Sequence, residues 1–228
     1  MKRPYVICHM LISKNGKVTG DFLKREDVLP SCEEYYDINR EEKADGYACG
    51  STTMKESFAG EFYPDLTEYR EDESKLFVAK KYDLYCLSYD RRGRVGWQTP
   101  VIDDPDPGYG GAGIVEIVTK RADGRYLSYL KDIGASFMVV EEEGEIKKSL
   151  EILYSEFGVR KVLLEGGSEI NGAFLRENCV DELSLVRVPV EEEDGKELFF
   201  GENYDCFELI ESKILPSGSV WERYRVRK

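Results

Sequence analysis

Residues 163–172 read LLEGGSEING, an apolar run that ends in a carboxylate, passes through two glycines and enters a segment with helical character. Two adjacent glycines allow a backbone to approach a ligand closely and to adopt unusual dihedral angles. Where a strand turns directly into a helix, free N–H groups and the helix dipole attract anions, and α/β sheets bind ligands at such turns. The stretch therefore predicts an α/β fold with an anion-binding turn, although a tight turn capped by Ser168 is the alternative for this segment alone.

Strand and helix patterns alternate on either side of this stretch. Strands are predicted at residues 5–12, 46–50, 76–79, 84–88, 114–119, 137–140 and 161–165, and helices at 31–43 with Ser31 as N-cap, 51–58, 125–132, 145–157 and 167–177. Three more strands, 182–189, 207–215 and 219–227, follow without helices between them. The alternation predicts a mixed, mainly parallel sheet with helices on both faces and an antiparallel C-terminal edge.

A second strand-to-helix turn lies at residues 47–54 (YACGSTTM), where a glycine precedes three hydroxyl side chains. Neither glycine turn matches G-x-G-x-x-G or the P-loop pattern, so neither a Rossmann fingerprint nor a nucleotide triphosphatase is indicated. No repeat or linker interrupts the chain, and the loop-forming residues 103–111 are followed at once by a strand. We therefore expect residues 1–228 to form a single domain.

Composition narrows the class of protein. The chain of 228 residues is 41% hydrophobic, enough for a sizeable core, and carries 32 Lys and Arg against 45 Asp and Glu, a net charge of −13. Such acidity argues against nucleic-acid and anionic-membrane binders, because phosphate groups would be repelled over most of the surface. His9 is the sole histidine and the six cysteines lack a C-x-x-C pair, so no metal site is expected. No signal peptide or apolar span of about 20 residues is apparent, which favours a cytoplasmic protein.

Three segments, in order, resemble the pyrimidine reductase family of riboflavin biosynthesis, the C-terminal domain of the bifunctional deaminase-reductase. Residues 163–175 (LLEGGSEINGAFL) with 180–183 (VDEL) are similar to the family's most specific segment. Residues 5–18 (YVICHMLISKNGKV) resemble its opening strand and S-L-D-G-K turn, and 64–67 (PDLT) with Arg70 resemble its P-x-L-T-x-R element with one extra residue. The resemblance spans almost the whole chain and implies a dihydrofolate reductase-like fold.

The resemblance further implies NADPH as the cofactor. The double-glycine turn would wrap the pyrophosphate of NADPH, and the second glycine turn would hold the other side of the cofactor. Two cations would pair with the adenosine 2′-phosphate. A solvated loop is an equal alternative for those two cations. The residues implied are Leu11 near the nicotinamide, and Gly50, Ser51, Thr52, Thr53, Thr119, Lys120, Arg121, Gly166, Gly167, Ser168, Glu169 and Ile170. By analogy with dihydrofolate reductase, the Gly166–Gly167 peptide is expected to be cis, and Thr53 and Ser168 to open onto one groove.

The residues implied for a phosphoribosylamino-pyrimidine substrate are Asn15, Lys17, Leu66, Arg70 and Glu165. Glu165 ends an apolar strand, where an unpaired carboxylate is costly, so we expect it to be hydrogen bonded. Asn15 departs from the family's aspartate, which leaves the substrate open. The companion deaminase needs an H-x-E and P-C-x-x-C zinc site that this chain lacks, so we expect the reductase activity alone.

The expected reaction is hydride transfer from NADPH to the ribosyl carbon of 5-amino-6-(5-phosphoribosylamino)uracil or a similar pyrimidine, with no catalytic side chain evident. A dihydrofolate or pterin reductase is an alternative, because residues 50–53 resemble G-R-x-T and Glu33 or Glu34 falls near that family's pteridine-binding acid. A reductase of another small conjugated substrate and a non-catalytic NADPH-binding protein also stay open. The edge-like run at 207–215, with the resemblance, suggests a homodimer.

Overall fold

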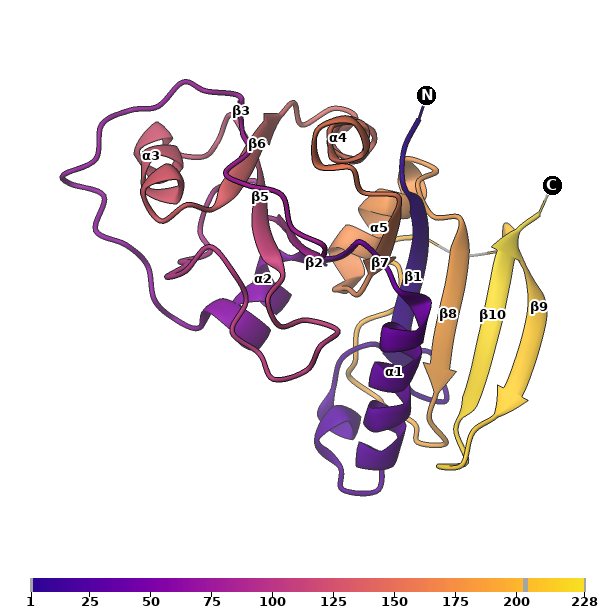
Figure 1. Ribbon diagram of the computed structural model, residues 1–228. Coiled ribbons are helices and arrows are strands. Elements are labelled where there is room, and N and C mark those ends of the chain that lie inside the picture. The colour runs from indigo at the N-terminus through magenta and orange to yellow at the C-terminus, as the bar shows by residue number, and fades with distance from the viewer. Residues whose placement is uncertain (1, 203–204, 228) are drawn as a thin grey trace. The chain divides into compact units, whose positions relative to one another are not determined.

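The computed structural model describes residues 2–202 and 205–227, in two compact units that are each built from separate stretches of chain (Figure 1). The first unit consists of Met1–Pro4 and Asp45–Val162. The second consists of Tyr5–Ala44 and Leu163–Lys228. Strand β7 (Lys161–Leu164) carries the chain from the first unit into the second.

The first unit is a sheet of mainly parallel strands with helices packed against it. Its strand order is β3-β6-β5-β4-β2, in which β2, β4, β5 and β6 run parallel and β3 is antiparallel to β6. The central strands are buried along their whole length, as expected for parallel strands covered on both faces. The elements are β2 (Gly46–Gly50), α2 (Ser51–Met54), β3 (Leu76–Phe77), β4 (Tyr85–Tyr89), β5 (Gly113–Thr119), α3 (Gly124–Asp132), β6 (Ser136–Val140) and α4 (Glu145–Ile152).

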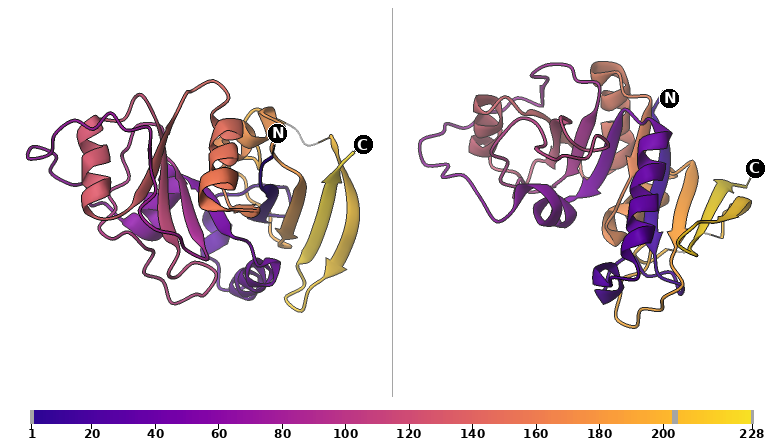
Figure 2. Two further views of the ribbon diagram at one scale, coloured as in Figure 1. Left: turned by 45° about the horizontal axis from the view of Figure 1, so that its top comes forward. Right: turned by 60° about the horizontal axis from the view of Figure 1, so that its bottom comes forward.

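The sheet of the second unit contains both parallel and antiparallel pairs of strands. Strand β1 is parallel to β8, and β8, β10 and β9 follow one another antiparallel, with β9 at the edge. Helix α1 lies along β1 (Figure 2). The elements are β1 (Tyr5–Ile12), α1 (Leu29–Glu42), α5 (Ser168–Arg176), β8 (Glu182–Arg187), β9 (Phe207–Ile214) and β10 (Val220–Val226). The predicted mixed α/β class, mainly parallel with an antiparallel C-terminal edge, is confirmed.

The predicted start of α1 is wrong. The helix begins at Leu29, with Val28 as its N-cap and Pro30 in its first turn. Proline favours this position because its fixed φ suits a helix and its missing N–H would have had no partner there. Ser31 therefore lies inside the helix, where its buried hydroxyl lies 2.8 Å from that of Ser219.

A chain of hydrogen bonds through the buried His9 and Ser184 fixes α1 on the sheet of the second unit. Trp221 Nε1 donates to Ser184 Oγ at 2.9 Å, and Ser184 Oγ lies 3.0 Å from His9 Nδ1. His9 Nε2 lies 3.0 Å from the carbonyl oxygen of Tyr35 on α1, and the two rings stack at 4.2 Å. Burial lowers the pKa of His9, which favours the neutral ring, with Nε2 donating to Tyr35 and Nδ1 accepting from Ser184.

In the part of the chain that the structure describes, no helix is both long and apolar enough to span a bilayer. The predicted loop at residues 103–111 contains neither helix nor strand. Cys8, Cys49 and Cys179 are buried and are not joined in disulfides.

Candidate active site

The double-glycine turn connects β7 directly to α5 in the second unit. The Gly166–Gly167 peptide is cis, as predicted. Gly166 has φ +104, and a Cβ there would lie 3.1 Å from Met10 Cε of β1. The turn thus needs glycine at position 166 for its backbone conformation.

The first turn of α5 holds two buried polar atoms that have no partner among the described residues, Ser168 Oγ and Asn171 Oδ1. The Asn171 amide nitrogen donates to the carbonyl oxygen of Leu198 at 3.1 Å, and Phe200 N donates to Ser168 O at 3.0 Å. A buried hydroxyl left without a partner at a helix N-terminus is suited to an anionic ligand, because it can donate where the free N–H groups and the dipole also attract negative charge. The turn therefore fits a phosphate-bearing cofactor.

Glu165 is buried at the carboxyl end of β7, directly before the turn. Its Oε1 accepts a hydrogen bond of 2.7 Å from Nδ2 of Asn39 on α1, which is also buried. The expectation that this carboxylate is hydrogen bonded is thereby confirmed. Burial, and secondarily the charge of Glu165, raises the pKa of the neighbouring Cys8 thiol.

The loop after β1 holds two of the predicted substrate residues, and both are engaged within the protein. Asn15 Nδ2 donates to Glu192 O at 2.8 Å, and its Oδ1 accepts from Glu192 N at 3.1 Å and from Ser13 Oγ at 2.8 Å. The ammonium of Lys17 forms an ion pair with Glu197. An aspartate at position 15 has no N–H to donate, so the asparagine explains how this loop is held to residues 192–197.

Leu11, predicted to lie near the nicotinamide, is buried on β1 beside Val186 of β8. It belongs to an apolar cluster that includes Phe22 and Ile38 of α1. Its side chain therefore helps to hold α1 against the sheet of the second unit.

Glu169 and Ile170 lie in the first turn of α5, exposed and half-buried respectively. The predicted residues at positions 50–53, 66, 70 and 119–121 lie in the first unit, most of them where parallel strands end. Gly50 ends β2, and Ser51 to Thr53 form the first turn of α2, partly exposed. Leu66 is half-buried, and Arg70 is exposed and forms no ion pair with any described residue. The buried Thr119 hydroxyl donates to Arg91 O at 2.8 Å.

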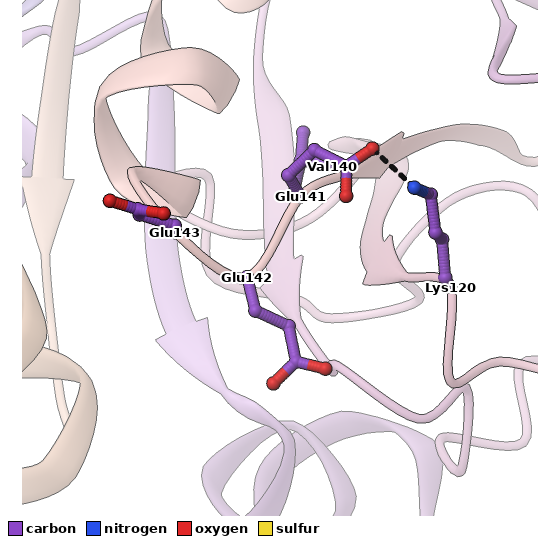
Figure 3. A pocket seen from close by; sticks show the side chains of 5 residues that line it. All are labelled: Lys120, Val140, Glu141, Glu142 and Glu143. Carbon is purple, nitrogen blue, oxygen red and sulfur yellow. Dashed lines mark ion pairs between the residues drawn. The ribbon is translucent and has the colours of Figure 1, made fainter.

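Of the two cations predicted to bind a 2′-phosphate, Lys120 lines a surface pocket at the ends of β5 and β6 (Figure 3), and Arg121 follows it in the chain. Lys120 Nζ lies 2.7 Å from Glu141 Oε1, and Arg121 Nη1 lies 3.6 Å from Glu142 Oε2. Glu143 also lines the pocket. Both cations are thus already balanced by exposed carboxylates.

The second unit brings Glu165, the double-glycine turn and α5 together, with Asn39 beside them. Thr53 and Ser168 belong to different units, so their common groove stays a prediction. Sequence reasoning missed Asn39 and Asn171. The sequence signal that could have identified Asn39 is its position four residues after Tyr35, which places its polar side chain on the same face of the helix. Across residues 2–202 and 205–227, no group of three or more His, Cys, Asp or Glu side chains is arranged to hold a metal.

Comparisons with known proteins agree with this geometry. Residues 110–218 match the RibD C-terminal domain family. The 2,5-diamino-6-ribosylamino-4(3H)-pyrimidinone 5′-phosphate reductase of Aquifex aeolicus is 29% identical over 196 residues, 83% of this chain and 79% of that protein. The enzyme of the same name from Archaeoglobus fulgidus is 26% identical over 194 residues, 82% of this chain and 81% of its own.

Among solved structures, a pyrimidine reductase-like protein from Corynebacterium diphtheriae superposes with a TM-score of 0.70 at 17% identity. The match covers 99% of this chain and 92% of that one, and it supports the predicted dihydrofolate reductase-like fold. Family model, sequence relatives and fold agree with the motif at residues 163–175: the chain is similar over 83% of its length to a pyrimidinone phosphate reductase, and its residues 110–218 match the RibD C-terminal domain family.

Proposed function

We propose that residues 1–228 form a single reductase domain that uses NADPH to reduce a phosphoribosylamino-pyrimidine. The observation that carries the proposal is the turn between β7 and α5, where the buried Glu165, two glycines and the unpartnered Ser168 hydroxyl follow one another. This arrangement offers a carboxylate to a base and a helix N-terminus to a pyrophosphate at adjacent positions. The named relatives act on a substrate of this chemistry.

In the proposed reaction, the cofactor when bound would supply a hydride to the ribosyl C1′. The C1′–O4′ bond of the sugar would break, and its ring oxygen would take a proton from solvent, which gives the open ribityl chain. Residues 166–170 would hold the pyrophosphate of the cofactor, and the main chain at Leu11 would lie near its nicotinamide. The exposed guanidinium of Arg70 neutralises the substrate phosphate. The protein contributes orientation and charge neutralisation, and no side chain is assigned a proton-transfer step.

Two forms of the base are candidates for the substrate. Our expectation from the sequence was the 2-oxo form, 5-amino-6-(5-phosphoribosylamino)uracil. The relatives from Aquifex aeolicus and Archaeoglobus fulgidus are named for the 2-amino form, 2,5-diamino-6-ribosylamino-4(3H)-pyrimidinone 5′-phosphate. The proposal covers both, and the choice between them depends on the surroundings of Glu165.

A pterin reductase is disfavoured by the surroundings of the two candidate acids. The carboxylate of Glu34 accepts hydrogen bonds from Ser217 N at 2.9 Å and from Ser217 Oγ at 2.5 Å. Glu34 thus holds the turn between β9 and β10. Glu33 is exposed on α1. Neither carboxylate is presented as a buried acceptor for a pteridine, whereas Glu165 is buried and oriented.

We further propose that the protein is a homodimer that forms through β9. This strand is at the edge of its sheet and leaves apolar side chains exposed, with Leu209 at 53%, Ile210 at 43% and Ile214 at 76% exposure. Exposed apolar edges pair readily with another chain. The six cysteines are not joined in disulfides, which suits a reducing compartment and supports a cytoplasmic location.

The test is NADPH oxidation by the purified protein with the 2-amino pyrimidine, the 2-oxo pyrimidine and dihydrofolate offered in parallel. Turnover of either phosphoribosylamino-pyrimidine but not of dihydrofolate is expected. Turnover of dihydrofolate alone would overturn the proposal. NADPH binding without turnover of any of the three would favour the non-catalytic binding protein.

A further inference from the structure

The hydrogen bond between Asn39 and Glu165 joins two buried polar side chains that lie 126 positions apart in the chain. We propose that Asn39 is a positioning residue, which fixes the Glu165 carboxylate as the acceptor for the 2-amino edge of the pyrimidine. The inference rests on the proposed function and adds the feature that selects the base. It assigns Asn39 no contact with the reacting atoms.

The position of Asn39 is set by the helix that carries it. Tyr35, one turn earlier on the same face of α1, stacks on the buried His9 ring and accepts its Nε2–H. Because residues four apart share a helix face, fixing Tyr35 on β1 also fixes the direction in which Asn39 points. The amide therefore reaches Glu165 from a helix whose register cannot slip without breaking a buried hydrogen bond.

The position of Glu165 is set by the strand and turn on either side of it. It follows the last residue of β7 and precedes Gly166, which packs against Met10 of β1. The main chain at Glu165 thus has little freedom. The side-chain carboxylate is oriented by Asn39, whose Nδ2 donates to Glu165 Oε1 at 2.7 Å. A buried carboxylate held in this way is a rigid pair of acceptors at the carboxyl end of a strand, where α/β sheets bind ligands.

The two candidate bases present different groups to such a carboxylate. The 2-amino pyrimidinone offers N3–H and the 2-amino group as adjacent donors, which match the two oxygens of a carboxylate. The 2-oxo base has a carbonyl oxygen in place of the amino group, so an acceptor would face an acceptor. A buried site rejects a ligand that leaves its polar atoms unpaired far more strongly than one that merely fits loosely.

The expected measurement is the ratio of kcat/KM for the 2-amino substrate to kcat/KM for the 2-oxo substrate. For the unaltered protein we expect a ratio of about 5 to 150, since an unpaired buried polar group is worth about 1–3 kcal/mol. In Glu165→Gln, the amide offers one donor and one acceptor, which match the 2-oxo base. The ratio should therefore fall at least about tenfold or reverse.

Asn39→Leu keeps a similar volume but leaves Glu165 without this donor, and the ratio should fall about threefold to tenfold while KM for NADPH is unchanged. Asn39→Asp is a second variant of nearly the same shape, which sets one carboxylate against another and should lower the ratio as well. A merely structural role would lower kcat/KM for both bases by the same factor. The control is Glu41→Gln, two residues further along α1 and exposed, which should change neither rate.

The outcomes separate this inference from the function on which it rests. If the unaltered protein reduces neither base, the proposed function fails. If it reduces them equally or prefers the 2-oxo base, the inference that Glu165 recognises the 2-amino edge is overturned. If the ratio is as expected but stays constant in Glu165→Gln and in both Asn39 variants, these two residues do not determine it, and the inference is likewise overturned.

Discussion

At the scale of single residues, Asn15 replaces an acidic side chain of the family motif, and its hydrogen bonds give the reason. Both ends of its amide bind the main chain of Glu192. Asn15→Asp should therefore loosen the loop, because a carboxylate would face the Glu192 carbonyl oxygen. We expect a loss of about 1 kcal/mol in the free energy of unfolding, measured by urea denaturation.

The neighbouring Lys14 provides the control for Asn15. It is exposed and forms an ion pair of 3.2 Å with Glu191, also exposed. Lys14→Gln removes this surface pair and should change the free energy of unfolding by less than about 0.5 kcal/mol. Equal effects of the two substitutions would contradict the bracing role of Asn15.

Glu116 is a fully buried carboxyl in the first unit, and it predicts how stability depends on pH. Burial, and next the charge of Asp90, raises its pKa well above the usual 4.5. The folded protein therefore keeps Glu116 neutral in a range where the unfolded chain ionises it. Because the folded state then binds more protons, this residue makes stability fall as pH rises above about 4.5 toward its folded pKa.

Glu116→Gln removes this dependence and keeps an acceptor for Trp97 Nε1, which donates to Glu116 Oε2 at 2.7 Å. Near neutrality the variant should be more stable than the unaltered protein, and the gain should vanish toward pH 4.5. Denaturant titrations across this range test it. Glu145→Gln is the contrast: Glu145 is buried but binds Arg91 at 2.6 Å, so the variant should lose stability.

At the scale of secondary structure elements, the ends of β5 and β6 carry the groups that would meet a 2′-phosphate. Glu141 competes for Lys120 there, and exposed pairs of this kind are worth about 0–1 kcal/mol. Glu141→Gln should therefore lower KM for NADPH by up to about fivefold and leave KM for NADH unchanged. Steady-state kinetics with both nucleotides tests this expectation.

Glu143→Gln is the matched control, since it removes the same charge from the same pocket. Glu143 pairs with no cation among the described residues and lies across the pocket from Lys120 (Figure 3). If both variants lower KM for NADPH equally, general charge around the pocket is responsible. Release of Lys120 would then not be the cause.

Secondary structure elements that depend on a local sequence pattern were predicted well. Side-chain contacts between positions far apart in the chain were not predicted. The run at 163–172 gave its strand, turn and helix because apolar periodicity and glycine act locally. The start of α1 was misplaced because Pro30 outweighed Ser31 as a signal. The partners of Glu165 and Lys120 lie 126 and 21 positions away, and no local pattern identifies contacts at such separations.

At the scale of the whole molecule, the proposed dimer makes a prediction about β9. Ile214→Glu places a charge on its most exposed apolar side chain and should weaken dimerisation at least about tenfold, because burying an unpaired charge costs more than about 1.4 kcal/mol. Sedimentation over a concentration series measures this. Lys213→Glu, the next residue and on the opposite face of the strand, is the control and should leave the dimer intact.

The protein has two tryptophans, and each unit contains one of them. Trp97 is buried against Glu116, and Trp221 donates to Ser184 in the hydrogen-bond chain that reaches α1. With either indole replaced by phenylalanine, the intrinsic fluorescence of the other reports the melting of its own unit. Coincident transitions in the two variants would mean that the units unfold as one cooperative body, and separate transitions would mean that the chain melts in two steps.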